Sequence, residues 1–345
     1  MANAKALRDL GYSVVFINAL LETDRPAMHE VFYEEFKCIE FKRGKQMEYL
    51  LSSRKIVSFI HKENAKIVIA YNYPSIALNR LRKYCQNHNI RCIADVTEWY
   101  VPTGNLVFRM IKGFDTEFRM RYVHKKMDAV IAISEYIYQY YNGEVDTVKI
   151  PPLVDIFEIK WKREEKVSKR HDAIRIIYAG SPSVQKERLD DIVNAVETCT
   201  TDISIRLDVI GLTQRQFETM YDCSYKGKRV KFYGRISNTE VINMIHHADW
   251  TVILRDNNKV VKAGFPTKVA ESISCGTPVI ANRFSNLEEY LNENNSILLD
   301  DINDFENAVK YLNKRTCIVD RTIFDYRGYK DTINEIIAYK GGKPC

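Results

Sequence analysis

Residues 262–281 (KAGFPTKVAESISCGTPVIA) place the tightest constraint on how this chain of 345 residues folds. They contain a turn of small residues, a helical segment, a Gly-Thr-Pro turn and then a continuous apolar run. An apolar run of this length between turns is typical of a buried strand. The turn that opens the helix presents unpaired backbone N–H groups and the positive end of the helix dipole, which together favour a bound phosphate.

Glu271 lies inside this helical segment, too far from its start to act as a cap. A carboxylate in that place could accept hydrogen bonds from sugar hydroxyls. A phosphate site and a ribose site together would bind a nucleotide. The same pattern also fits an ordinary loop, helix and strand with a solvated Glu, and periodicity alone does not separate the two interpretations.

Helix-like and strand-like segments alternate along most of the chain. Strands are predicted over residues 12–17, 66–70, 91–95, 128–133, 174–179, 203–210, 230–233 and 250–254. Helices are predicted over residues 2–10, 45–61, 75–85, 135–141, 189–198, 239–247 and 331–339. In the helix over 45–61 the inward residues are expected to be Met47, Leu50, Leu51, Ile56 and Ile60. Such alternation predicts an α/β fold in which helices cover both faces of parallel sheets.

The alternation divides into two halves of ordinary domain size. We expect an N-terminal Rossmann-like domain over residues 1–155, a charged linker over 156–172 and a C-terminal Rossmann-like domain over 173–325. The last residues, 326–345, are expected to form a helix that packs back on the first domain. A cleft between two such domains is the expected ligand site. The chain opens inside what reads as the first helix of its domain, so the first strand is expected to be missing.

Composition narrows the possible partners and location. No apolar stretch approaches the length that crosses a bilayer, and the first residues have no apolar signal core. The eight cysteines have no metal-binding or disulfide spacing, which favours reduced thiols and a cytoplasmic location. The net charge of +6 suits an anionic ligand or an anionic membrane surface. No long basic stripe alternates with aromatic residues, so nucleic acid is not an expected partner.

Several short motifs of the second half occur together in one known family. They are YAGSP at 178–182, Lys186, FYGR at 232–235, Ala248-Asp249, Leu254-Arg255, GFPTKVAE at 264–271 and CGTPVI at 275–280. With these motifs the chain resembles the group-1 (family 4) retaining glycosyltransferases of the GT-B fold. The GFPTK sequence before the helix, DVTEWY at 95–100 and IAIS at 131–134 look like the subset from bacterial surface and capsular polysaccharide biosynthesis. The resemblance spans most of the chain and is strongest over residues 174–290.

The resemblance implies a nucleotide-sugar donor, with UDP as the expected nucleotide, and a role for each matching residue. Gly180 would let the donor diphosphate approach the backbone, and Lys186 would face a phosphate. Arg235 and Ile236 would flank the nucleobase. The turn beside the diphosphate and the sugar would consist of Gly264, Phe265, Pro266 and Thr267. Glu271 matches the second acid of the Glu-x7-Glu motif of the family, which would hold the ribose hydroxyls.

The chain departs from the family pattern at two positions. The first acid of the Glu-x7-Glu motif falls on Ala263, so the contact that this acid would make to the transferred sugar is absent or replaced. Ser181 stands where many members have a phosphate-binding Arg. Arg255 could supply that charge instead. Catalysis by leaving-group stabilisation would then depend on Lys186 and Arg255, without a metal, because backbone N–H groups and cations can neutralise a departing diphosphate.

The acceptor is expected on the first domain. Asp95 and Glu98 follow a buried strand at its carboxyl end, where ligands of parallel sheets collect. A carboxylate there could take the proton of the acceptor hydroxyl or orient it, or it could merely cap a helix. His124 is another candidate base, although a lone His in a basic helix is more often structural. The acceptor would be a saccharide or a lipid-linked saccharide.

Residues 108–126 combine basic and aromatic side chains at helical spacing. This pattern suits an anionic membrane surface, which would make the protein peripheral at the inner face of the membrane. It also fits a helix docked on its own domain with a solvated basic face.

Two other functions remain compatible with the sequence. A nucleotide-sugar epimerase shares the two-domain architecture, although it needs paired acid and base groups around the sugar and Ala263 supplies none. A degenerate partner subunit, which binds a nucleotide or only another transferase, would account for the departures at Ala263 and Ser181.

Overall fold

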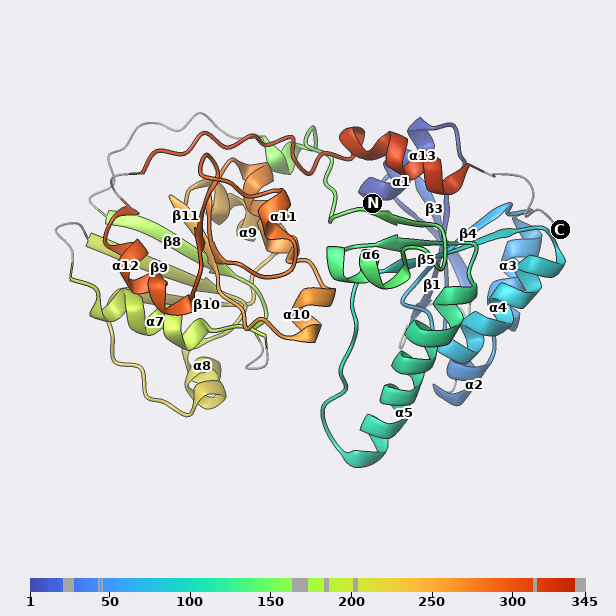
Figure 1. Cartoon of the computed structure of the whole chain (residues 1–345), viewed down its shortest axis with the longest axis horizontal. Helices are drawn as coiled ribbons and strands as arrows, with labels where there is room; N and C mark the ends of the chain where they lie inside the picture. Colours follow the sequence, from blue (N-terminus) through green and yellow to red (C-terminus); the bar gives the residue numbers. More distant parts are fainter. Residues whose placement is uncertain are drawn as a thin grey trace. The chain divides into compact units, whose positions relative to one another are not determined.

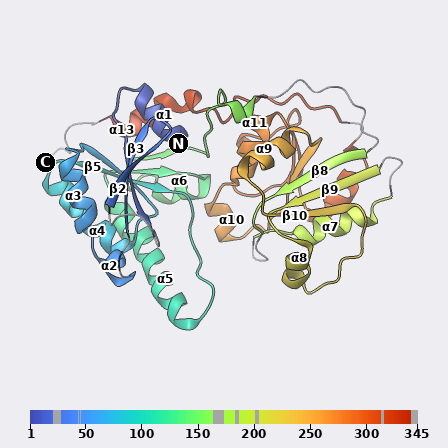
Figure 2. The ribbon, with the colours of Figure 1, turned by 180° about the vertical axis from the view of Figure 1, so that it is seen from behind.

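A computed structural model describes residues 1–20, 28–42, 44, 46–162, 173–182, 186–200, 204–312 and 315–338. The chain divides into two compact units, Met1–Pro151 with Tyr329–Cys345, and Pro152–Gly328. Figures 1 and 2 show both from opposite sides. Of the linker expected over 156–172, residues 163–172 lie outside the described residues, and Ile159–Trp161 form a single 3-10 turn.

The first unit is an α/β structure with two sheets. Its strands are β1 (Val15–Leu20), β2 (Met28–Tyr33), β3 (Phe36–Lys42), β4 (Ile67–Tyr71), β5 (Arg91–Val96), β6 (Ala129–Ala132) and β7 (Thr147–Lys149). Its helices are α1 (Ala2–Asp9), α2 (Gln46–Leu51), α3 (Arg54–Lys62), α4 (Ser75–Asn87), α5 (Leu106–Phe118), α6 (Glu135–Tyr141) and α13 (Lys330–Ile337). Helix α13 contacts α1, β6 and β7.

Strands β4, β5, β6 and β7 form one parallel sheet in that order, and β1, β3 and β2 form another. Strand β1 runs parallel to β3, whereas β2 and β3 form an antiparallel hairpin that the sequence prediction missed. Its turn, Glu34-Glu35, lacks the usual Asn-Gly signal, although Glu34 adopts a left-handed φ of 53°. Within the described residues, β1 pairs only with β3 and β4 only with β5.

The single helix predicted over 45–61 is wrong, because two helices, α2 and α3, take its place. They are separated at Ser52-Ser53, where the Ser52 hydroxyl accepts a hydrogen bond from the Arg54 backbone N–H at 3.3 Å. Serine side chains compete with helical hydrogen bonds in this way. Met47, expected inside, is exposed, whereas Ile60 is buried as predicted.

The second unit has one six-stranded parallel sheet. Its strands are β8 (Ala173–Ala179), β9 (Ser204–Ile210), β10 (Val230–Gly234), β11 (Trp250–Ile253), β12 (Val279–Asn282) and β13 (Ser296–Leu299). Its helices are α7 (Leu189–Thr198), α8 (Gln214–Tyr221), α9 (Asn238–His246), α10 (Lys259–Ala263), α11 (Thr267–Cys275) and α12 (Phe305–Val309). The order β10-β9-β8-β11-β12-β13 is the doubly wound order of a Rossmann fold.

Apolar residues at helical spacing explain how helices pack on the sheet of the second unit. Leu189, Ile192, Val193 and Val196 follow the i, i+3, i+4, i+7 pattern along α7 and are all buried in the core. Helix α7 contacts β9 and α12, while α9 and α11 contact each other beside β8 and β12 (Figure 1). The predicted α/β class with two Rossmann-like units is therefore confirmed.

No helix in the described parts of either unit is both long enough and apolar enough to cross a bilayer.

Candidate functional site

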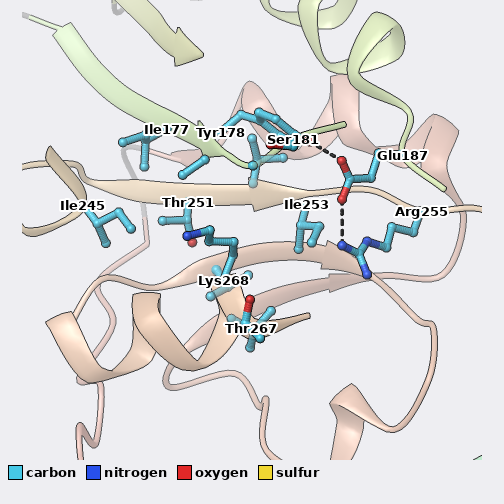
Figure 3. A pocket seen from close by; sticks show the side chains of 15 residues that line it. Ile177, Tyr178, Ser181, Glu187, Ile245, Thr251, Ile253, Arg255, Thr267 and Lys268 are labelled. Carbon is cyan, nitrogen blue, oxygen red and sulfur yellow. Dashed lines mark hydrogen bonds and ion pairs between the residues drawn. The ribbon is translucent and has the colours of Figure 1, made fainter. Parts of the chain in front are cut away.

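A cavity of about 160 Å³ opens in the second unit at the carboxyl ends of β8 and β11. These neighbouring strands are the point at which the strand order reverses, where ligands of doubly wound sheets bind. Figure 3 shows the cavity from close by. Its lining consists of Ile177, Tyr178, Ala179, Gly180, Ser181, Glu187, Ile245, Thr251, Val252, Ile253, Arg255, Thr267, Lys268, Val269 and Val279.

One wall of the cavity is the turn that follows β8. The Gly180 backbone N–H donates to the Ile210 carbonyl at 3.1 Å, which holds the turn against the end of β9. Gly211, with φ of +114°, packs so closely that a Cβ atom there would lie 1.6 Å from the Gly180 oxygen. A side chain at position 211 would therefore not fit beside the turn that lines the cavity.

The opposite wall is the start of α11. Pro266 precedes the helix and supplies no capping side chain. The Val269 N–H donates to the Pro266 carbonyl at 2.9 Å, whereas the N–H groups of Thr267 and Lys268 have no partner among the described residues and remain open toward a ligand. The Ser285 hydroxyl donates to the Gly264 carbonyl at 2.7 Å and so holds the preceding turn in place. An uncapped helix start of this kind favours an anion.

A buried chain of polar side chains lies along the cavity. The Tyr178 hydroxyl donates to the Glu187 carboxylate, and Arg255 Nη2 donates to the same carboxylate at 2.6 Å (Figure 3). Burial, together with the Glu187 charge, raises the pKa of Tyr178 well above its usual range. The phenol therefore stays protonated and acts as a donor to Glu187.

Arg255 is held at its backbone as well as at its guanidinium. The Asn282 side chain accepts from the Arg255 N–H at 2.9 Å and donates to the Arg255 carbonyl at 2.9 Å. Its Nε is buried and has no hydrogen-bond partner among the described residues. The residue thus has a fixed position, a charge balanced by Glu187 and one unused donor.

Glu271 lies one turn along α11, at the place predicted for a ribose contact. Lys268 Nζ donates to Glu271 Oε2 at 2.6 Å, and the Glu271 side chain is about one-fifth exposed. The other carboxylate oxygen, Oε1, has no partner in the part of the chain that the structure describes. It is available to accept hydrogen bonds from hydroxyl groups.

Only some of the residues predicted for the donor site line the cavity. Gly180, Ser181, Arg255 and Thr267 line it together, and Glu271 contacts its lining residue Lys268. The remaining predicted residues are not in the lining: Lys186, Arg235, Ile236, Gly264, Phe265 and Pro266.

Two of these residues, and the neighbouring Ala263, have clear surroundings. Phe265 packs its ring against Tyr290 and Phe324, so it anchors the turn rather than facing the cavity. Lys186 is half-buried beside Glu187 and has no ion-pair partner among the described residues. Ala263, where the family has its first acid, is fully buried and offers no polar group.

The candidate acceptor residues lie in the first unit. Asp95 is the penultimate residue of β5, and Glu98 follows in the segment after that strand. Both are half-buried, and neither side chain makes a hydrogen bond within the described residues, although the charge of the amino terminus acts on Asp95. Burial raises the pKa of Asp95 to about 6. A carboxyl group with such a pKa can exchange a proton near neutral pH.

His124 is structural, as the sequence favoured. It is buried, and its Nδ1 lies 3.1 Å from the Tyr141 hydroxyl. Burial lowers the pKa of His124 to about 3, which leaves the ring neutral.

Sequence reasoning assigned no role to Glu187, Lys268 or Asn282. Lys268 belongs to the GFPTK motif and Glu187 adjoins Lys186, so both stand beside residues that were singled out. Asn282 lies at the end of β12, and it comes to lie beside Arg255 because β12 pairs with β11. Within the described residues, no group of three or more His, Cys, Asp or Glu side chains is arranged to hold a metal ion.

Comparison with known proteins relates this site to one enzyme family. Residues 159–316 match the family model of glycosyl transferases group 1. This stretch contains the cavity and every residue that lines it. No curated protein sequence matches the chain.

Solved structures share the fold at low sequence identity. Sucrose-phosphate synthase from Thermosynechococcus elongatus is 17% identical with a TM-score of 0.65, covering 97% of this chain and 87% of its own. UDP-forming trehalose-phosphate synthase from Burkholderia xenovorans is 10% identical with a TM-score of 0.65, covering 99% and 97%. Anabaena HepE in complex with UDP-glucose is 14% identical with a TM-score of 0.59, covering 83% and 81%. These likenesses confirm the predicted GT-B fold with two Rossmann-like domains.

Proposed function

We propose that this protein is a glycosyltransferase that moves a sugar from a nucleotide-diphosphate donor, with UDP as the nucleotide, to a saccharide or lipid-linked saccharide. The observation that carries the proposal is the cavity in which the Gly180 turn meets the uncapped start of α11. The group 1 match over residues 159–316 supports it, as do the UDP and UDP-glucose complexes of the HepE neighbour.

In this proposal the donor diphosphate would lie between Gly180, Ser181 and the N–H groups near Thr267. The leaving phosphate gains negative charge as the glycosidic bond breaks, and fixed N–H groups and cations stabilise that charge without reorganisation. Lys268 and the unused Nε donor of Arg255 are cationic groups of the lining, and Lys186, outside the lining, would supply a further charge to a phosphate. Glu271 Oε1 would accept the ribose hydroxyls.

The proposal extends to the finer features predicted by the resemblance. Transfer would proceed with retention and without a metal ion, and Asp95 and Glu98 would bind or deprotonate the acceptor. The product would belong to bacterial surface polysaccharide biosynthesis in the cytoplasm. A lipid-linked acceptor would bring the protein to the inner face of the membrane.

A second candidate is favoured by one observation. Ala263 is fully buried, so the position of the first motif acid contributes nothing to the cavity. A degenerate subunit that binds a nucleotide without turnover would have no need of that acid. The epimerase alternative has no comparable support, because Ala263 supplies neither an acid nor a base.

The test is donor turnover by the full chain with a panel of nucleotide sugars and a lipid extract of bacterial membranes, with and without EDTA. UDP release that requires the extract and survives EDTA would support the proposed transfer. Interconversion of free nucleotide sugars would identify an epimerase. Tight UDP binding without turnover would favour the degenerate subunit, and no binding of UDP at all would overturn the proposal.

A further inference from the structure

In helix α5 of the first unit, apolar side chains are exposed and the buried side chains are polar, which is the opposite of an ordinary surface helix. Five of its exposed residues form an apolar stripe, Leu106, Val107, Met110, Ile111 and Phe114, and Phe108 and Arg109 are exposed beside it. At 3.6 residues per turn, these five positions fall within an arc of about 140° on the helix surface. Leu106 is 70% exposed, Met110 66% and Phe114 59%.

The residues of α5 itself that are buried against the domain, Asp115 and Thr116, are polar. Asp115 is buried and its carboxylate accepts from the Ser75 backbone N–H at 2.7 Å. Arg119, just after α5, is buried and donates to the Asn72 and Tyr73 carbonyls. The apolar stripe is therefore directed away from the fold that these polar contacts secure, and core packing does not account for it.

The apolar stripe continues as a stack of aromatic rings. Phe114 and Phe118 have centroids 5.5 Å apart at 8°, and Phe118 and Tyr122 have centroids 5.1 Å apart at 13°. Lys126 Nζ lies 3.8 Å from the centroid of the Tyr122 ring. Figures 1 and 2 show α5 projecting from the rest of its unit. The exposed surface thus runs from an apolar end to an aromatic and basic end.

Basic side chains border the stripe. Arg109 and Lys83 are exposed and have no ion-pair partner among the described residues. The pKa of Tyr122 is lowered by its hydrogen bond with Lys126 and by the nearby charges of Arg82 and Lys83. The acids of this helix are already engaged, since Asp115 binds Ser75 and Glu117 binds Trp99 and Arg121. The uncompensated charge beside the stripe is therefore positive.

We infer that the α5 surface, formed by Leu106, Val107, Met110, Ile111, Phe114, Phe118 and Tyr122, docks on an anionic lipid bilayer. An apolar stripe bordered by unpaired cations matches the acyl boundary and the phosphate level of such a membrane. Isolated exposed apolar residues are ordinary, but a contiguous stripe of this kind marks an interaction site. The inference goes beyond the proposed transfer reaction and does not depend on it.

The exposed apolar surface begins earlier in the chain than the basic and aromatic segment that the sequence singled out. For residues 108–126 the sequence allows either a membrane-facing helix or a helix docked on its own domain, and Arg119, Met120, Val123 and His124 are buried within the domain. The surface instead begins at Leu106, at the end of α5 that Asn105 caps.

The inference is tested by co-sedimentation of the full chain with vesicles of phosphatidylcholine alone or with one-quarter phosphatidylglycerol. The wild type should bind the anionic vesicles and release as salt screens the cations. Met110→Glu/Phe114→Glu should bind at least tenfold more weakly, because each change places a charge on the apolar stripe. Arg109→Ala/Lys83→Ala should weaken binding to anionic vesicles and reduce its salt dependence.

Ile318→Glu is the matched control, because Ile318 is 84% exposed in the other unit and its replacement should leave vesicle binding unchanged. Circular dichroism and light scattering of each variant would check folding and mass. Equal binding of wild type and Met110→Glu/Phe114→Glu would overturn the inference, as would no preference for anionic vesicles. A fall in oligomeric mass on Phe114→Glu, without any effect on vesicles, would assign the surface to a second copy of the chain.

Discussion

At the scale of single residues, the candidate site depends on how charges are balanced. Glu187 neutralises Arg255 inside the fold, and Glu271 neutralises Lys268 at the start of α11. A diphosphate entering the cavity would compete with these carboxylates for the two cations. Burial makes such pairs sensitive to the loss of either partner, because an unpaired buried charge is costly.

Replacing Glu271 by Ala should weaken UDP affinity by about tenfold or more, since a carboxylate that accepts hydroxyl donors makes charge-assisted hydrogen bonds. Folding should be little affected, because the only described partner of Glu271 is Lys268. Calorimetric titration with UDP measures the effect. Glu306→Ala, at an exposed position of the same unit, should retain wild-type affinity. Loss of folding in Glu271→Ala would instead give the residue a structural role.

Lys186→Ala should lower turnover on the order of a hundredfold, comparable to the loss of one oxyanion donor. The side chain is half-buried beside Glu187 and has no ion pair among the described residues, so its charge is available to a ligand. Rates of UDP release with a productive donor and acceptor measure the change. Lys228→Ala, at an exposed site, provides the comparison. An unchanged rate in Lys186→Ala would remove the residue from the proposed mechanism.

Asp95→Asn should stabilise the protein at pH 8. The pKa of about 6 in the folded state exceeds the ordinary Asp value of 3.8, so the folded state binds more protons between these values. The contribution of Asp95 to the free energy of unfolding therefore falls as the pH rises from 3.8 to about 6, and it stays lower at higher pH. Removing the ionisable group should recover up to about 3 kcal/mol in the free energy of unfolding at pH 8.

The gain from Asp95→Asn should largely disappear at pH 4, where the carboxyl group is protonated in the folded state. Urea unfolding at both pH values measures the difference. Asp331→Asn, at an exposed position of the same unit, should show no comparable pH-dependent gain. A gain of equal size at pH 4 and pH 8 would contradict the assigned pKa.

At the scale of elements, the cavity exists because two turns approach without side chains. The turn after β8 and the turn after β9 meet at Gly180 and Gly211, residues from different strand ends. The start of α11 faces them with open N–H groups because Pro266 supplies no cap. Backbone geometry, more than any side chain, makes this a site for an anion.

Gly211→Ala should therefore disturb the site strongly. Its Cβ would collide with the Gly180 oxygen, and its φ of +114° would add strain. We expect a loss of at least about 2 kcal/mol in unfolding free energy beyond that of Gly143→Ala. Gly143 also has a positive φ, of 88°, but a Cβ there would meet nothing within 4 Å. Urea unfolding and UDP titration of both variants give the comparison, and equal stabilities would contradict the contact.

At the scale of the whole molecule, the chain consists of two units with separate sheets. All lining residues of the cavity belong to the unit Pro152–Gly328, while Asp95, Glu98 and the α5 surface belong to the other. A nucleotide that binds the cavity should therefore raise the free energy of unfolding of the unit Pro152–Gly328 more than that of the other unit.

Hydrogen exchange of the full chain with and without UDP should detect this difference. At a UDP concentration one hundred times the dissociation constant, opening of the strands of the second unit should become about 2.7 kcal/mol less favourable. Amides of β5 and β6 in the first unit should change much less. Protection confined to the first unit would contradict the placement of the nucleotide site.

Short-range sequence patterns determine most of the secondary structure of this protein and part of its candidate site. The strand and helix alternation, the α11 turn and the carboxyl-end position of Asp95 follow from short-range periodicity, since apolar spacing and turn residues act over only a few positions. The same reasoning failed at Ser52-Ser53 and at the β2–β3 hairpin, where side-chain competition and a turn without a strong signal decided the outcome.

Only the tertiary structure decided the rest. Arg255 pairs with Glu187, 68 positions away, and Gly211 meets Gly180 because parallel strands align their carboxyl ends. The apolar face of α5 is exposed because Asp115 and Arg119 hold the opposite face to the domain. Such pairings depend on which strands are neighbours, and that order is set by packing of the whole sheet rather than by any segment of the sequence.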